Sequence, residues 1–155
     1  MRCYLTQDGK AGMAITRSGD VVSLFSSGGG YSMGKLIPTA VALGGRKLDC
    51  YGMGLQNMYS RYGARAISQT AFVDDYAPSD WNGQDRPPVV AMILPRSVDE
   101  IVRKYDKGRS VDMARVKEYD DYDAMIEARD KVLKREDRKL SAAGSKIRGL
   151  YGMGR

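Results

Sequence analysis

Residues 26–37, "SSGGGYSMGKLI", have the residue types and spacing most suited to chemistry in this 155-residue chain. The stretch separates an apolar run typical of a strand from a segment with helical spacing. Three consecutive glycines cost conformational entropy, so they usually serve a backbone purpose. A glycine-rich loop that leads into a helix presents backbone N–H groups to an anion such as phosphate. The candidate pyrophosphate-binding residues are Gly28, Gly29, Gly30, Ser32, Gly34 and Lys35.

Two well-defined phosphate loops fit this stretch incompletely. Gly29, Gly34 and Lys35 match the pattern GxxxxGK, but the next position is leucine, where a P-loop has Ser or Thr to hold Mg²⁺. A dinucleotide fingerprint needs a third glycine at position 33, which is Met33. A general anion site at a helix N-terminus requires only exposed backbone N–H groups and no fixed motif. The alternative without a ligand is a plain strand-to-helix turn.

The residues before this loop predict a small antiparallel sheet. The turn signals Asp8-Gly9 and Ser18-Gly19 separate three short runs with strand character. The third run, residues 21–25, leads directly into the glycine-rich loop. We therefore expect the loop to begin where a strand ends.

The residues after the loop predict a strand–helix–strand unit. Apolar residues recur at helical spacing from Leu36 until Gly44-Gly45 stops the helix. The strand "RKLDCY" follows, then a short helix ending at Gly63, the strand "RAISQTAFV", a polar loop and the strand "VVAMIL". The expected fold is α/β (α+β), with a mixed, mainly antiparallel sheet around this central unit. We expect a cleft between the strands at 21–25 and 47–51.

The last third of the chain has a different composition. Residues 1–95 carry nine Lys and Arg against seven Asp, whereas residues 96–155 carry 16 basic against 12 acidic residues. Ser97, followed by acidic residues, is typical of a helix start. Residues 110–140 predict a long charged helix with a narrow apolar stripe, interrupted by Arg129 and Glu136. We therefore predict a domain at 1–95 and a charged helical extension with a basic tail at 96–155.

The extension also suggests partners. A helix with a narrow apolar stripe must pack on its own domain or on another chain, so residues 96–155 are expected to contact protein partners, including a second copy. Residues 134–155 carry seven basic against two acidic residues, and such a tail can make weak contacts with nucleic acid.

Composition excludes several classes of site. The chain has no histidine, which removes His-based triads and most zinc sites, and Cys3 and Cys50 lack CxxC spacing, so we predict no metal site. We expect both thiols to be free in a reducing compartment. No signal peptide is recognised and no apolar run approaches ~18 residues, so we expect no membrane association.

Several segments between residues 10 and 95 resemble one family. "RKLDC", "MYSRYGA", "FVDDYAPSDW" and "RPPVVAM", together with the glycine-rich loop, resemble the acetyl-CoA-binding half of the GNAT acyltransferase superfamily. The likeness is to small GNAT-like modules of bacteriophages and mobile elements. It implies acetyl-CoA as cofactor, with its pyrophosphate on residues 28–35. Tyr59 matches the tyrosine that GNAT enzymes often use to protonate the leaving thiolate, a role that a phenol can fill.

The chain departs from the family pattern on the acceptor side. Ser26 and Ser27 stand where the family usually has Gln or Arg, and Ala64 replaces the usual Phe. The N-terminal helices that wall the acceptor site in the family are not recognised here. A general base would have to be Asp74, Asp75, an activated water or the acceptor itself. The acceptor half is therefore either lost or rebuilt from residues 96–155.

Two hypotheses follow from the resemblance. In the first, the chain is a phage-encoded GNAT-fold transferase that moves acetyl from acetyl-CoA to an unknown amine, with Tyr59 as general acid. In the second, it is a catalytically inactive GNAT-like structural or assembly protein, such as an internal virion protein of a bacteriophage. The expected location is the cytoplasm of a bacterial host cell or the interior of a phage particle.

Overall fold

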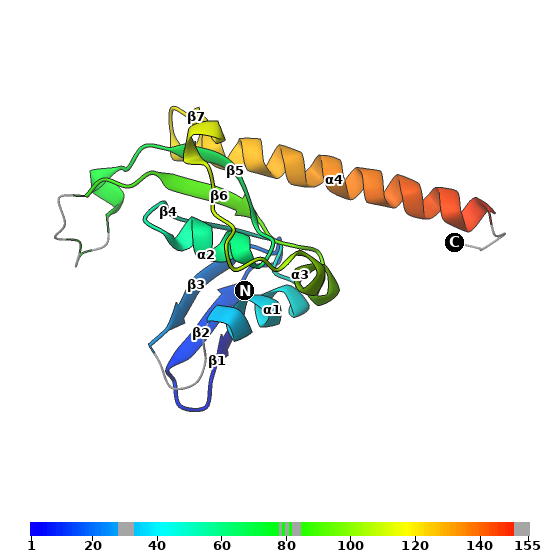
Figure 1. The fold of residues 1–155 in the computed structure, drawn as a ribbon, viewed down its shortest axis with the longest axis horizontal. Coiled ribbons are helices and arrows are strands. Elements are labelled where there is room, and N and C mark those ends of the chain that lie inside the picture. The colour runs from blue at the N-terminus through cyan, green and yellow to red at the C-terminus, as the bar shows by residue number, and fades with distance from the viewer. Residues whose placement is uncertain (28–32, 78, 80, 82–84, 151–155) are drawn as a thin grey trace.

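Two sheets and four α-helices make up the described part of the chain, which in this computed structural model comprises residues 1–27, 33–77, 79, 81 and 85–150 (Figure 1). The first sheet has the spatial order β1 (Arg2–Leu5), β2 (Ala11–Ile15) and β3 (Val21–Ser26). The second has the order β4 (Lys47–Tyr51), β6 (Val89–Ile93), β5 (Arg65–Thr70) and β7 (Lys117–Tyr119). The helices are α1 (Met33–Ala42), α2 (Leu55–Arg61), α3 (Val98–Lys104) and α4 (Tyr122–Leu150), with 3-10 turns η1 (Asp74–Tyr76) and η2 (Met113–Arg115). The expected mixed α/β class is confirmed.

The first sheet is an antiparallel meander. Its two reversals are the ones predicted, and they need glycine because Gly9 has φ +70° and Gly19 has φ +85°. All five residues of β2 are buried, since the strand lies between β1 and β3 and is covered by α1.

The predicted strand–helix–strand unit is β3–α1–β4. α1 buries one apolar face in the core, made by Leu36, Ile37, Ala40 and Val41. β3 and β4 are parallel neighbours, but only an isolated bridge between Asp20 and Lys47 joins them in the described structure. Next to that bridge, the Gly19 carbonyl oxygen accepts hydrogen bonds from the backbone N–H of Arg46 (2.7 Å) and of Lys47 (3.2 Å). Beyond this closed end, the two strands separate.

The second sheet is covered on both faces. Successive residues of its central strand β6 point to opposite faces. Val90 and Met92 belong to the main hydrophobic core, whereas Ala91 lies opposite Ser68, whose hydroxyl donates to the Met125 carbonyl of α4 (2.7 Å). α4 therefore covers the face opposite the core, and α2 packs beside β4 and β5.

The predicted single helix over residues 110–140 is wrong in its first third. Residues 113–115 form η2, residues 117–119 form β7 parallel to β5, and α4 begins at Tyr122. The side chain of Gln69 donates to the carbonyl oxygens of Met113 (2.8 Å) and Val116 (2.7 Å). Contacts from β5 thus satisfy backbone groups that a helix would have satisfied internally. The predicted Ser97 cap of α3 is confirmed, because its side chain accepts from the Glu100 N–H.

α4 has two different halves. Met125, Arg129 and Leu133 recur at i, i+4 and i+8 and are 0%, 0% and 7% exposed, so they form the stripe that packs on the second sheet. From Arg138 to Ala143 every residue is exposed, and the helix runs on past the edge of the sheet (Figure 1). Among the described residues, no helix combines the length and apolarity that crossing a membrane requires.

Candidate functional site

A cavity of ≈ 890 Å³ opens where β3 and β4 separate, as the sequence predicted. Its volume lies within the range of pockets for small-molecule ligands. The walls come from β3, β4, α2 and the start of α4. The lining residues used below are Ser23, Asp49, Cys50, Tyr51, Tyr59, Asp121, Tyr122 and Asp123.

A β-bulge in β3 lies beside the place where the strands separate. Gly12 pairs with Phe25 and Ala14 with Val22, so two residues of β3 stand opposite the single residue between Gly12 and Ala14. One of the two, Ser23, has φ +56°, a left-handed conformation that costs a non-glycine residue roughly 1–2 kcal/mol. A bulge bends and twists its strand, and here it lies in the cavity wall.

Tyr59 reaches the cavity from α2. It is 5% exposed, and its hydroxyl makes no hydrogen bond to another described residue. Burial, followed by the nearby Cys50, raises the pKa of Tyr59 to about 12. The phenol is therefore protonated at neutral pH. Full proton transfer to a thiolate of pKa ~8.5 would be uphill by roughly 5 kcal/mol, so a hydrogen bond to developing negative charge is the role that this phenol fits best.

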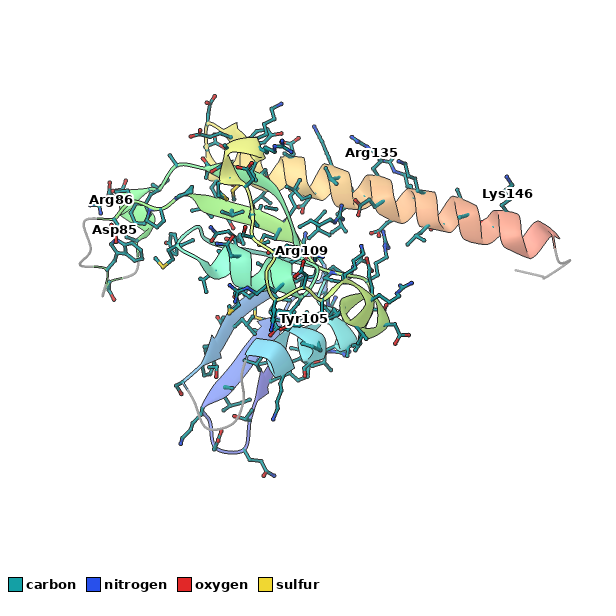
Figure 2. All side chains as sticks on the ribbon, in the orientation of Figure 1. Asp85, Arg86, Tyr105, Arg109, Arg135 and Lys146 are labelled. Carbon is teal, nitrogen blue, oxygen red and sulfur yellow. The ribbon has the colours of Figure 1, made fainter. Side chains whose placement is uncertain are left out.

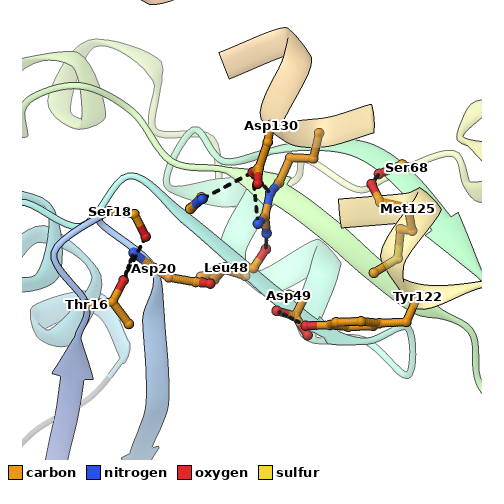
Figure 3. A network of polar contacts seen from close by, with 11 residues as sticks. Thr16, Ser18, Asp20, Leu48, Asp49, Ser68, Tyr122, Met125 and Asp130 are labelled. Carbon is orange, nitrogen blue, oxygen red and sulfur yellow. Dashed lines mark hydrogen bonds and ion pairs between the residues drawn. The ribbon is translucent and has the colours of Figure 1, made fainter. Parts of the chain in front are cut away.

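Asp49 and Tyr122 form a polar pair at the α4 end of the cavity (Figure 3). The Tyr122 hydroxyl donates to Oδ1 of Asp49 at 3.3 Å. Burial raises the pKa of Asp49, the carboxylate of Asp20 raises it further, and Arg129 and the Tyr122 hydrogen bond oppose the shift. Burial and the neighbouring Asp49 raise the pKa of Tyr122 to about 12. Tyr122 is therefore the proton donor of the pair.

A buried cation lies behind this pair. The guanidinium of Arg129 donates from Nη1 to the Leu48 carbonyl oxygen (3.0 Å) and from Nε to Oδ1 of Asp130 (3.1 Å). Lys47 Nζ contacts the same Asp130 oxygen at 3.2 Å. Within the described structure, Nη2 of Arg129 and Oδ1 of Asp20 are buried without a hydrogen-bond partner, although Nη2 lies 3.1 Å from Asp130 Oδ1 as an ion pair.

The predicted pyrophosphate-binding residues are only partly described. Gly28, Gly29, Gly30 and Ser32 lie outside the described residues, and Gly34 and Lys35 lie in the first turn of α1. Lys35 is exposed there. Whether these residues hold a pyrophosphate stays a prediction.

The two aspartates considered as general bases do not line the cavity. Asp74 and Asp75 are exposed on η1, and Oδ1 of Asp74 pairs with Nε of Arg86 at 2.7 Å. Asp49 is the acid that faces the cavity from a strand. Its place between Leu48 and Cys50 in "RKLDC" could have indicated this, because strand alternation makes a charged residue in a buried strand unusual.

The segment "DDYAPSDW" contributes an aromatic contact at one wall of the cavity. The Trp81 ring packs against Tyr51 and Phe72, with ring centroids 5.3 Å and 5.2 Å apart. Because Tyr51 lines the cavity, the described part of this segment supports a wall and supplies no acid to the site.

Both cysteines are free thiols, as predicted. Cys3 is exposed on β1, whereas Cys50 is half-buried in the cavity wall. Burial and the charge of Asp49 raise the pKa of Cys50 to about 12. A thiol that stays protonated is a poor nucleophile, so this position favours a lining role over covalent catalysis.

No family model matches the chain, and neither a curated protein nor a solved structure matches it. Within the described residues, no group of three or more Cys, Asp or Glu side chains is placed to hold a metal ion.

Proposed function

We propose that the chain is a GNAT-like N-acetyltransferase that transfers acetyl from acetyl-CoA to an amine in the cavity between β3 and β4. The observation that carries the proposal is the separation of two parallel strands around Tyr59, whose hydroxyl has no partner among the described residues. A phenol aimed into a cavity is available to a ligand atom that gains negative charge.

The strand separation also leaves backbone groups available. Beyond the bridge between Asp20 and Lys47, the edge of β4 that faces β3 has no strand partner in the described structure. Unpaired backbone N–H groups at that edge are suitable donors for the carbonyl oxygen of a bound thioester. The acetyl thioester is the chemistry that acetyl-CoA would supply.

The charge of the cavity suggests how such a donor would lie. The charged side chains of the described lining are acidic, which disfavours phosphate groups inside it. The uncharged thioester arm fits the cavity better. The phosphates would then lie outside, near the glycine-rich loop that precedes the ten-residue helix α1, where the helix dipole favours negative charge.

The acceptor side would be rebuilt from the C-terminal third. Asp121, Tyr122 and Asp123 bring the start of α4 to the cavity, and the family's N-terminal helices are not needed to close that side. This arrangement supports the second of the two possibilities raised by the sequence, a rebuilt rather than a lost acceptor half.

A structural or assembly role is the second candidate, because the outer half of α4 extends past the sheet. Arg135 and Lys146 point away from the domain along that helix (Figure 2). An exposed basic helix of this length fits a protein or nucleic-acid partner in a particle better than it fits catalysis.

Binding of acetyl-CoA to the full-length chain separates the two candidates. We expect calorimetry to give a dissociation constant between ~1 µM and ~1 mM, the usual range for enzyme substrates, with free CoA competing. Tyr59→Phe should retain this affinity, because a hydrogen bond to developing charge acts in the transition state. If no binding occurs at about 1 mM, the transferase proposal fails, and the assembly candidate is then tested by light scattering of the full chain and of a chain ending at Lys139.

A further inference from the structure

We propose that the α4 end of the cavity binds the protonated amino group of a small organic cation, with the Asp49 carboxylate as its ligand and Tyr122 as the residue that positions Asp49. The inference deepens the proposed function by naming a class of acceptor, a small diamine or polyamine. Its binding step stands independently of any acetyl transfer.

The first argument is the sign of the charge in the cavity. The charged side chains of its described lining are Asp49, Asp121 and Asp123, and the lining contains no Lys or Arg. Charges of one sign between low-dielectric walls focus the field and concentrate ligands of the opposite sign. A cationic ligand is therefore favoured.

The second argument is independent of the acids. Tyr59 is more than nine-tenths buried, lines the same cavity, and leaves its hydroxyl without a hydrogen-bond partner among the described residues. The hydroxyl oxygen is not itself among the buried atoms that lack a partner, so it is open to the cavity and can donate to, or accept from, a ligand there. The cavity therefore offers an uncharged donor and acceptor in addition to its acidic side chains.

The third argument is the incomplete environment of Asp49. Its carboxylate accepts one hydrogen bond, from Tyr122, and forms no ion pair with a described residue. The groups that face it are Asp20, ahead of β3, and Arg129 and Tyr122 on α4. Lys47 and Arg129 are both held by Asp130. A half-buried carboxylate with a like charge nearby and its cations engaged elsewhere would gain a partner from a ligand ammonium.

The other two acids have different roles. Oδ1 of Asp121 accepts a hydrogen bond from the Ala124 N–H at 2.8 Å, so this carboxylate caps α4. Asp123 is exposed in the first turn of α4 and lines the cavity. Asp49 is thus the candidate ligand for one amino group. Asp123 adds negative charge for a second, which favours a diamine over a monoamine.

The test is calorimetric titration of the full-length chain at pH 8 with 1,4-diaminobutane, and with 1,4-butanediol as the uncharged compound of similar shape. We expect the diamine to bind and the diol to bind at least tenfold more weakly. Asp49→Asn should weaken diamine binding about tenfold or more, because the amide oxygen can still accept a hydrogen bond but the negative charge that strengthens it is lost. Asp99→Asn, the same change at an exposed position on α3, should stay within twofold of the wild type.

Tyr122→Phe keeps the proposal testable if Asp49→Asn fails to fold. The Tyr122 hydrogen bond lowers the pKa of Asp49, so its loss should move the rise of diamine affinity to higher pH. A purely structural role for Tyr122 would change affinity equally at every pH. The proposal is overturned if the diamine does not bind, if the diol binds as well, or if neither variant changes diamine binding.

The experiments distinguish failure of the cation site from failure of the transferase proposal. Diamine binding that depends on Asp49, without acetyl-CoA binding, would reject the transferase and keep the cation site. Acetyl-CoA binding without diamine binding would keep the transferase proposal and reject the cation site.

Discussion

Nη1 of Arg129, in α4, donates a hydrogen bond of 3.0 Å to the backbone carbonyl oxygen of Leu48, in β4, and the whole Arg129 side chain is buried. The contact ties the helix that carries Tyr122 to the strand that carries Asp49. Because Asp130 and the Leu48 carbonyl both face the guanidinium, the buried charge is compensated. The C-terminal third of the chain therefore helps to shape the cavity wall.

We expect Arg129→Ala to lower the free energy of unfolding by about 3–5 kcal/mol, the usual cost of removing one partner of a buried ion pair. Lys131→Ala is the matched control on the same helix. Lys131 is exposed, and among the described residues its ion pair is with exposed Glu127, so its loss should cost at most about 0.5 kcal/mol. Urea unfolding at pH 7 measures both values, and a loss below 1 kcal/mol for Arg129→Ala would contradict this account.

The second prediction concerns truncation. A chain ending at Leu94 should not fold, because it lacks the edge strand β7 and the stripe of Met125, Arg129 and Leu133 that covers the second sheet. A chain ending at Lys139 keeps these contacts and should unfold within about 1 kcal/mol of the full chain. Circular dichroism and urea unfolding measure both. A folded 1–94 fragment would support the predicted division into a domain at 1–95 and an extension at 96–155.

Much of the fold could be predicted because its signals are local. The two glycine turns, the stop after α1 and the Ser97 cap each depend on a few neighbouring residues, and each is where it was expected. β7 could not be predicted in this way. Its three residues, "KEY", have no strand pattern of their own, and the strand exists because β5 supplies backbone partners and the Gln69 side chain.

Only the β3, β4 and α2 side of the candidate site could be predicted from the sequence. The cleft and Tyr59 follow from strand–helix–strand order and from the family resemblance. Asp49 and Tyr122 are 73 positions apart, and their contact depends on how α4 docks. Arg129 illustrates the same limit: its charge reads as an interruption of the apolar stripe, whereas the partners that allow its burial, Leu48 and Asp130, appear only in three dimensions.

The third prediction tests the bulge in β3. Ser23 has φ +56°, so Ser23→Gly should relieve strain and raise the free energy of unfolding by roughly 0.5–1 kcal/mol. Ser23→Val should lower it by more than about 1 kcal/mol, because a β-branched residue rarely adopts this conformation. Urea unfolding of the two variants measures the difference. If the valine variant is as stable as the wild type, β3 can straighten and the bulge does not fix the cavity.

The fourth prediction concerns Tyr59 and depends on the proposed transferase activity. Tyr59→Phe should lower kcat by about 10²-fold and change KM little, because the lost hydrogen bond acts mainly in the transition state. Tyr62→Phe, close by in the chain but not in the cavity lining, should stay within twofold. Since the pKa of Tyr59 is raised to about 12, kcat should show no loss from its ionisation up to pH 10. An unchanged kcat in Tyr59→Phe would make Tyr59 a core residue.

The last prediction concerns stability against pH. The pKa of Asp49 is raised in the folded chain above its unfolded value of ~3.9, chiefly by burial. Between these two pKa values the folded state binds more protons than the unfolded state, so the Asp49 contribution to stability falls as pH rises through that window. Asp49→Asn cannot ionise, and we therefore expect it to be more stable than the wild type at pH 7.

The difference between Asp49→Asn and the wild type should shrink as the pH falls from 7 to 4 and vanish near pH ~3, where Asp49 is protonated in both folded and unfolded chains. Urea unfolding at pH 4, 5, 6 and 7 measures it. Glu136 and Asp137 have lowered pKa values and lose stabilisation as pH falls, but they are present in both proteins and cancel in the difference. Asp99→Asn is the control for removing an exposed carboxylate; because Asp99 lies in the first turn of α3, its loss should lower stability at pH 7 by at most about 1 kcal/mol, opposite in sign to the gain expected for Asp49→Asn. If Asp49→Asn is instead less stable at pH 7, attraction to Arg129 outweighs the burial of Asp49, and the carboxylate already has the cation that the proposed ligand would supply.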